Sequence, residues 1–324
     1  MNESTALAVP QRDARTIEVT VESILRASEG VVALTLSGEN PLPEWSPGAH
    51  IDVHLPEGMV RQYSLCGDTR DRSRYRVAVL REESGRGGSR WIHDVLRPGA
   101  KLAISPPRNN FAMVASSSVL FIAGGIGITP ILPMVMAAET SGVDWHLLYG
   151  GRTRESMAFI DELPGEGKRV ILHPQNEAGH LPLNEWLAEP QPETHIYTCG
   201  PEPLIAAVEA ASAAWPSENV HFERFRAPEG ADEEVAGPFE VVLGRSGEIL
   251  TVPAEKSILD VLEDQGLIVL SSCREGTCGT CETKVLDGIP DHRDWVLSEA
   301  EKKANDTMMV CVSRACSARI TLDL

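Results

Sequence analysis

The sequence of 324 residues predicts three successive domains: an antiparallel β-barrel, an α/β domain with a parallel sheet, and a small C-terminal domain. Three observations lead to this prediction. Short β-favouring runs separated by turn clusters fill residues 1–113. From residue 118 a buried strand, a glycine turn and an apolar helix follow one another. Beyond residue 238, a unit of fewer than ninety residues contains five of the seven cysteines.

The strand signals of the first domain are runs rich in branched and aromatic residues. They cover residues 16–25, 31–36, 50–55, 61–65 and 75–80. Turn clusters at residues 38–41 and 46–48 separate them, as in a small barrel or sandwich. We therefore expect an antiparallel β domain over residues 1–113.

The second domain, expected over residues 114–226, has the alternation of a βα fold. A buried strand at 119–123 precedes a helical stretch at 130–139, and three further strand signals lie at 146–149, 169–173 and 195–198. The spacings leave room for crossover helices, so we expect a parallel sheet. Residues 227–238 are rich in Pro, Gly and acid and predict a linker to the third domain, residues 239–324.

Composition excludes several classes of function. Acidic side chains outnumber basic ones by 47 to 29, a formal net charge of −18 that repels nucleic acid. The longest apolar run, residues 119–128, is shorter than the ~20 residues that cross a bilayer. The first 17 residues lack the apolar segment of a signal peptide. We expect a cytoplasmic protein that binds neither nucleic acid nor membrane.

The strongest motif is a group of cysteines. Cys273, Cys278 and Cys281 have the spacing C-x4-C-x2-C, and Cys311 follows after a long interval. This is the ligand spacing of a plant-type [2Fe-2S] cluster. A zinc site is the alternative, but zinc ligands usually come as two separate pairs. Cys316 is left over as a spectator, although an exchange of ligand roles with Cys311 stays open.

These motifs resemble a known family. Residues 239–324 look like a plant-type ferredoxin domain, which implies an α+β (β-grasp) fold, and the chain from Ile17 onward is similar to the phthalate dioxygenase reductase family. That family includes vanillate demethylase reductases. The resemblance implies an FMN-binding barrel, an NAD-binding domain and a ferredoxin domain in this order. It also implies a separate Rieske-type oxygenase as the partner that accepts the electrons.

A flavin site is indicated by two segments of the first domain. In Arg61-Gln62-Tyr63-Ser64 a guanidinium suits a phosphate, a ring suits stacking, and a hydroxyl can reach a flavin ring nitrogen. A glycine-rich loop at 85–88 precedes a helical pattern, with Ser89 expected as its N-cap. The family resemblance implies that FMN is held by Arg61, Tyr63, Ser64, Gly87, Gly88 and Ser89. FAD stays open, because the spacing does not exclude an adenosine extension.

A dinucleotide site is indicated by the turn Gly124-Gly125-Ile126-Gly127-Ile128-Thr129-Pro130, with Thr129 expected as the helix N-cap. It departs from the Rossmann pattern and resembles the ferredoxin reductase nucleotide domain. The resemblance implies that NADH is bound by Gly124, Gly125, Gly127, Thr129, Arg152, Cys199, Gly200 and Pro201. It places Cys199 beside the nicotinamide and Phe225 near the flavin, so the expected catalytic residues are Ser64, Cys199 and Phe225.

These sites together predict an electron-transfer enzyme. Hydride passes from NADH to the flavin, and single electrons pass through the cluster to the partner; no protein acid or base is demanded. Arg152 and Arg154 could accept the 2′-phosphate of NADPH, but the family resemblance favours NADH. Two alternatives remain: a redox-responsive regulatory protein without turnover, and a reductase for a haem-dependent or other monooxygenase.

Overall fold

The computed structural model describes residues 16–165, 167–228 and 237–324. The chain divides into two compact units, Met1–Glu223 and Arg224–Leu324. Most of the predicted linker, residues 229–236, lies outside the described residues.

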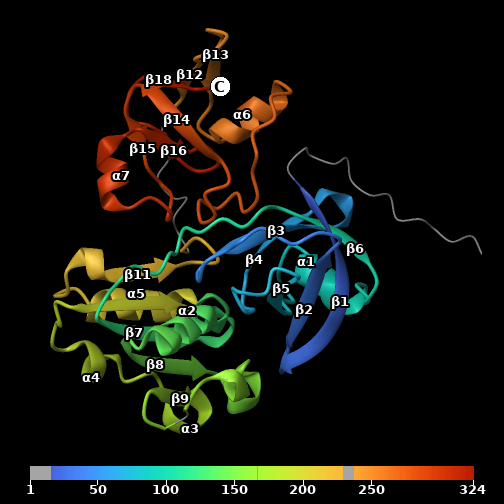
Figure 1. The fold of residues 1–324 in the computed structure, drawn as a ribbon. Coiled ribbons are helices and arrows are strands. Elements are labelled where there is room, and N and C mark those ends of the chain that lie inside the picture. Colours follow the sequence, from blue (N-terminus) through green and yellow to red (C-terminus); the bar gives the residue numbers. More distant parts are fainter. Residues whose placement is uncertain (1–15, 166, 229–236) are drawn as a thin grey trace, which may run out of the picture. The chain divides into compact units, whose positions relative to one another are not determined.

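The first part of the first unit is an antiparallel barrel (Figure 1). Its strands are β1 Ile17–Ser28, β2 Val31–Gly38, β3 His50–His54, β4 Val60–Ser64, β5 Arg74–Leu80 and β6 Lys101–Ile104. They are ordered β4-β3-β6-β1-β2-β5, and a bridge between Leu65 and Val77 joins the two outer strands. The short helix α1 (Gly88–Asp94) follows β5. The predicted barrel is therefore confirmed.

The second part of this unit is a parallel sheet (Figure 1). Its strands are β7 Ser118–Gly124, β8 Asp144–Gly151, β9 Val170–Pro174, β10 Thr194–Cys199 and β11 Val220–Glu223. The order β11-β10-β7-β8-β9 puts the switch in strand order between β7 and β10, and ligands of such sheets bind beyond the carboxyl ends of the strands there. The parallel sheet was predicted from the sequence, but its edge strand β11 was not.

Helices cover both faces of the parallel sheet. The helix α2 (Ile128–Ser141) packs on one face, and α4 (Leu183–Leu187) and α5 (Glu202–Ala211) pack on the other. The short helix α3 (Gln175–Ala178) follows β9. Barrel residues Cys66, Ala78 and Phe111 share one hydrophobic core with α2 and the sheet, so the barrel and the sheet are packed as one body.

The second unit is a small α+β domain, as predicted (Figure 1). Its sheet comprises β12 Phe239–Leu243, β13 Ile249–Val252, β14 Glu282–Asp287, β16 Thr307–Met309 and β18 Arg319–Leu322. The order is β13-β12-β18-β14-β16, with β12 and β18 parallel. The helix α6 (Ile258–Asp264) packs on the sheet. A two-stranded pair, β15 (Pro290–Asp291) with β17 (Arg314–Ala315), and α7 (Glu299–Ala304) complete it.

Two predicted helix caps are wrong. Gly87, not Ser89, is the N-cap of α1, and Gly127, not Thr129, is that of α2. Ser89 Oγ instead accepts a hydrogen bond from the Glu82 N–H at 3.1 Å, and Thr129 Oγ1 donates to the Ile126 carbonyl at 2.9 Å. In both cases the cap lies two residues before the predicted one. Gly87 has φ +85, a conformation that favours glycine, whereas Gly127 has helical backbone angles and its lack of a side chain makes room for the Cys199 carbonyl.

Short 3₁₀ helices fill several connections: η1 Pro56–Gly58, η2 Gly125–Gly127, η3 Arg154–Ser156, η4 Ile160–Glu162 and η5 Ser217–Asn219. In the described part of the chain, no helix combines the length and apolar character that a bilayer crossing requires.

Candidate functional site

The predicted flavin residues come from β4 and from the glycine loop before α1. Arg61 and Tyr63 lie two positions apart on β4 and so share one face of the strand. The Arg61 guanidinium donates a hydrogen bond to the Arg86 carbonyl at 2.7 Å. The positive charge of Arg61 therefore lies beside the glycine loop. A Cβ at Gly88 would lie 2.7 Å from Arg61 Cγ, so glycine at this position makes room for the arginine.

Ser64 is the last residue of β4, and it tests whether the end of this strand suits a flavin. The residue is buried, and its Oγ has no hydrogen-bond partner among the described residues. A buried hydroxyl without a partner is costly, and a ring nitrogen or oxygen of a bound cofactor would supply one. Burial also raises the pKa of the neighbouring Tyr63 hydroxyl, which therefore stays neutral and suited to stacking. The residues present fit a flavin.

The two glycine turns of the nucleotide domain touch each other at the carboxyl ends of β7 and β10. A Cβ at Gly127 would lie 2.2 Å from the Cys199 carbonyl oxygen, and one at Gly200 would lie 3.1 Å from Gly124 Cα. Pro201 Cδ would meet a Cβ at Gly124 at 2.8 Å. Gly125 has φ +53 and nothing within 4 Å of its Cβ position, so one side of the turn is open. Such a turn lets a dinucleotide approach the backbone closely.

Cys199 lies at the end of β10, opposite Glu223 at the end of β11. Burial, and after it the charge of Glu223, raises the pKa of the Cys199 thiol, which therefore stays protonated. Burial raises the pKa of the Glu223 carboxyl to about 8. Its Oε2 is buried without a hydrogen-bond partner among the described residues. Glu223 was not predicted as a site residue; the available signal was an acidic residue that follows the apolar Phe222 at a strand end.

The remaining predicted residues of the first unit are more peripheral. Arg152 and Arg154 are exposed just beyond the carboxyl end of β8, and Thr129 is buried in the first turn of α2. Phe225 is 39% exposed and falls in the second unit.

The four predicted cluster ligands are buried and meet around one loop of the second unit. The thiol of Cys273 hydrogen bonds with those of Cys278 and Cys311, and Cys281 does so with Cys311. Those thiols, together with backbone N–H groups, hold the pKa of Cys273 well below its usual value. Cys316 is exposed, and its Sγ lies 3.7 Å from the Pro290 carbonyl oxygen, which favours Cys311 as the fourth ligand.

The loop supplies donors to the sulfur atoms. The N–H groups of Glu275 and Thr277 donate to Cys273 Sγ at 3.3 and 3.4 Å, and Thr280 Oγ1 lies 3.1 Å from Cys278 Sγ. Gly276 has φ +68, and a Cβ there would lie 2.6 Å from Val312 Cγ2. Among the described residues no three cysteine, histidine or acidic side chains are placed to hold a single metal ion. Buried thiols with N–H donors fit an iron–sulfur cluster.

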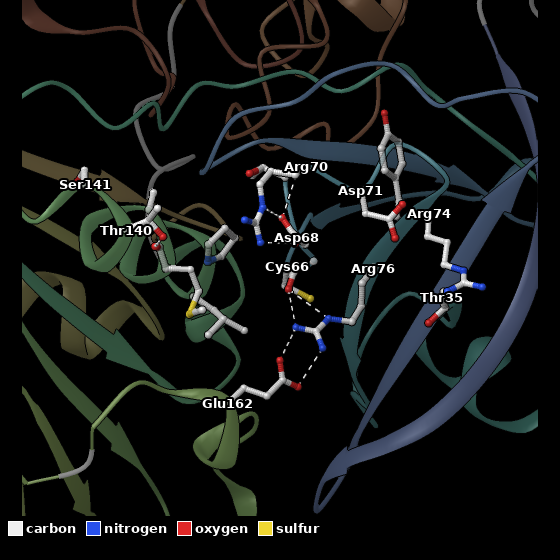
Figure 2. Close-up of a pocket in the computed structure, with 17 residues that line it drawn as sticks. Thr35, Cys66, Asp68, Arg70, Asp71, Arg74, Arg76, Thr140, Ser141 and Glu162 are labelled. Carbon is white, nitrogen blue, oxygen red and sulfur yellow. Dashed lines mark hydrogen bonds and ion pairs between the residues drawn. The ribbon is translucent and has the colours of Figure 1, made fainter.

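A cavity of about 690 Å³ lies elsewhere, between the barrel loop 66–76 and α2 (Figure 2). None of the predicted site residues lines it. Four of its charged side chains form two ion pairs: Arg70 with Asp68 at 2.8 Å and Arg76 with Glu162 at 2.7 Å. The Arg76–Glu162 pair was also missed, because the two residues are 86 positions apart.

Comparison with known proteins matches two parts of the chain to known domain families. Residues 121–210 match the model of the oxidoreductase NAD-binding domain, and residues 241–320 that of the 2Fe-2S iron-sulfur cluster binding domain. The chain is 43% identical to the phenoxybenzoate dioxygenase subunit beta of Ectopseudomonas oleovorans, covering 95% of this chain and 97% of that protein.

Two solved structures are similar over nearly the whole chain. One is phthalate dioxygenase reductase, described as a modular structure for electron transfer from pyridine nucleotides to [2Fe-2S]: TM-score 0.70, 38% identity, 95% of this chain and 98% of that chain. The other is an intact type IV self-sufficient cytochrome P450 monooxygenase: TM-score 0.91, 40% identity, 98% of this chain. The chain spans only 43% of the length of that P450.

The fold and the sites define a pyridine-nucleotide-dependent flavin iron–sulfur reductase. Its cofactors are FMN, NADH and a [2Fe-2S] cluster. The chain belongs to the phthalate dioxygenase reductase family.

Proposed function

We propose that the chain is the reductase component of a Rieske-type oxygenase that dioxygenates an aromatic ring or removes an O-methyl group. The observation that carries this proposal is the group of four thiols, Cys273, Cys278, Cys281 and Cys311, on a chain that also has the glycine turns of a nucleotide site. The relative named as a dioxygenase subunit supports an oxygenase as the electron acceptor.

Each cofactor has a proposed set of residues. FMN would be held by Arg61, Tyr63, Ser64, Gly87, Gly88 and Ser89, with Phe225 near its ring. NADH would be held by Gly124, Gly125, Gly127, Thr129, Arg152, Cys199, Gly200 and Pro201. The cluster would be held by the four thiols. The FMN domain would comprise residues 1–113, the NADH domain residues 114–226 and the cluster domain residues 239–324. Residues 227–238 would link the last two domains.

The chemistry comes from the cofactors, since bound FMN accepts a hydride and gives up electrons one at a time to the cluster. The protein's part is to position and shield them. The Ser64 hydroxyl would fix the flavin ring edge, and Arg61 would neutralise the phosphate. Cys199, kept protonated by burial, would pack against the nicotinamide without adding charge. The seven free cysteines support a reducing compartment such as the cytoplasm.

Reconstitution with purified oxygenases tests this proposal. The reductase is mixed with NADH, a Rieske-type aromatic-ring oxygenase and its organic substrate, and product formed per NADH is measured. We expect coupled product formation and lower kcat/KM with NADPH. Cys278→Ser, which removes a proposed cluster ligand, should abolish coupling while NADH still reduces a dye.

A second candidate is a reductase for a haem-dependent monooxygenase, favoured by the TM-score of 0.91 with the P450 structure. The same assay with a haem monooxygenase in place of the Rieske oxygenase distinguishes them. Turnover with the haem enzyme alone would contradict the Rieske assignment. Failure to oxidise NADH in every mixture, with dye present, would instead indicate a regulatory protein without turnover.

A further inference from the structure

Glu223 and Cys199 face each other at the carboxyl ends of two neighbouring parallel strands. They are register partners on β11 and β10, and Glu223 is close enough for its charge to affect the thiol. The Cys199 carbonyl in turn abuts Gly127 of the nucleotide turn. A carboxyl group therefore lies in the place where the proposed function puts the nicotinamide ring, and its Oε2 has no hydrogen-bond partner in the described structure.

Among the described residues, no cationic side chain contributes to the pKa shift of Glu223. On β11, His221 shares its face, and burial followed by the neighbouring His195 of β10 lowers the pKa of His221 to about 4. Cys199 on β10 stays a neutral thiol. The first turns of α2 carry only apolar side chains and Thr129. Arg224 follows Glu223, with its guanidinium over the Trp295 ring at 5.0 Å.

Burial alone raises the pKa of Glu223 to about 8, and no charged side chain of the described residues adds to this shift. At pH 7 the acid form therefore predominates. This balance would change if a cation entered the site, because a nearby opposite charge stabilises the carboxylate. A buried charge is costly without a partner, so such a cation and this carboxylate would each need the other.

NADH and NAD⁺ differ in the charge of the nicotinamide ring. The nicotinamide ring of NADH is uncharged, whereas that of NAD⁺ is a cation. Resting on the proposed function, we propose that Glu223 is the counter-ion of the oxidised nicotinamide: a neutral acid while NADH is bound and a carboxylate while NAD⁺ is bound.

The atoms and charges balance. The C4–H bond of NADH breaks, and its hydrogen leaves with the electron pair for the flavin, which is reduced; the nicotinamide is oxidised to its cation. The O–H bond of Glu223 breaks, and its proton goes to solvent. The carboxylate that remains neutralises the new positive charge. Release of NAD⁺ then lets Glu223 take up a proton again.

Calorimetry on the FMN- and cluster-loaded protein tests this inference. Binding of NAD⁺ is measured between pH 6 and 9 in pairs of buffers with different ionisation heats, which gives the number of protons released. The comparison ligand is 1,4,5,6-tetrahydro-NAD, whose ring is uncharged and donates no hydride. The variants are Glu223→Gln and, as a matched control, Glu218→Gln, which removes an exposed carboxylate near the start of β11.

In the unaltered protein NAD⁺ affinity should rise about tenfold per pH unit below pH 8, because only the ionised fraction binds well. Close to one proton should be released per NAD⁺ at pH 7, and none with the tetrahydro ligand. Glu223→Gln should remove the pH dependence and the proton release, while Glu218→Gln keeps both.

Equal pH dependence for the two ligands, or no proton release by the unaltered protein, would overturn the counter-ion role even if Glu223→Gln fails to fold. A slope retained in Glu223→Gln would do the same. Failure of the proposed function would give a different result: the unaltered protein would bind neither ligand, and NADH would not reduce the flavin.

Discussion

Arg76 of β5 and Glu162 of η4 form a two-point ion pair, with Nη1–Oε1 at 2.9 Å and Nη2–Oε2 at 2.7 Å (Figure 2). Arg76 also donates to the Cys66 carbonyl, at 2.7 Å from Nη2, and lies over the Phe159 ring at 4.8 Å. Cys66 is two residues beyond Ser64. One side chain thus connects the end of the proposed flavin strand with the nucleotide-binding part of the unit.

Replacing this arginine should weaken that connection. We expect Arg76→Ala to slow flavin reduction by NADH and to lower the free energy of unfolding by about 2 kcal/mol, since the Cys66 carbonyl loses its donor. Glu162 is half exposed, so Glu162→Gln should cost less, about 0.5 kcal/mol. Stopped-flow bleaching of the flavin and urea unfolding measure the two effects. Arg74→Ala, which breaks an ion pair within the barrel, is the control and should leave the reduction rate unchanged.

Ser64→Ala should separate cofactor chemistry from stability. The hydroxyl has no hydrogen-bond partner among the described residues, so its removal should not destabilise the cofactor-free protein. If the hydroxyl bonds to the flavin, the rate of flavin reduction should fall about tenfold, the equivalent of one hydrogen bond of ~1.4 kcal/mol. Ser73→Ala, in an exposed turn, serves as control. A reduction rate unaffected by Ser64→Ala would remove Ser64 from the flavin site.

The two late cysteines should differ sharply. Cys311→Ser should lose most of the bound iron and sulfide, because Cys311 is buried among the other thiols. Cys316→Ser should keep a full cluster, because Cys316 is exposed and lies apart. Iron and acid-labile sulfide analysis measures both. Loss of iron in Cys316→Ser together with a full cluster in Cys311→Ser would show that Cys316, and not Cys311, is the fourth cluster ligand.

His221 should make stability depend on pH. Its folded-state pKa is lowered from 6.5 to about 4, mainly by burial, so between these values the unfolded chain binds more protons than the folded one. Stability should therefore fall as the pH falls from about 6.5 to 4. His221→Asn should flatten this part of the profile, measured by urea midpoints at each pH. The exposed His180→Asn should not, and an unflattened profile in His221→Asn would place the acid sensitivity elsewhere.

Much of the fold follows from local sequence. The runs at 31–36 and 75–80 became β2 and β5 with small changes of boundary, because alternating branched residues favour a half-buried strand. The strand β11 was missed because its four residues, Val-His-Phe-Glu, are too few for a periodic signal. The predicted N-caps Ser89 and Thr129 were wrong. Hydroxyl residues are common N-caps, but in both helices a preceding glycine occupies the cap position.

The site divides in the same way. Cysteine spacing predicted a group that the structure brings together: Cys273, Cys278 and Cys281 share one loop, and Cys311 follows β16. Glu223 could be recognised as a site residue only from its burial and from its pairing with Cys199 on the neighbouring strand. The Arg76–Glu162 pair depends on packing of the barrel against the sheet. Properties of that kind arise from tertiary contacts, which a single sequence does not encode locally.

The most direct test of the account is an anaerobic titration of the loaded protein with NADH, followed by absorption and electron paramagnetic resonance. The account predicts that NADH bleaches the flavin and that the rhombic signal of a reduced [2Fe-2S] centre grows with it. In Cys278→Ser the flavin should still bleach without that signal. A flavin that NADH fully reduces while an intact cluster in the unaltered protein stays oxidised would contradict the account.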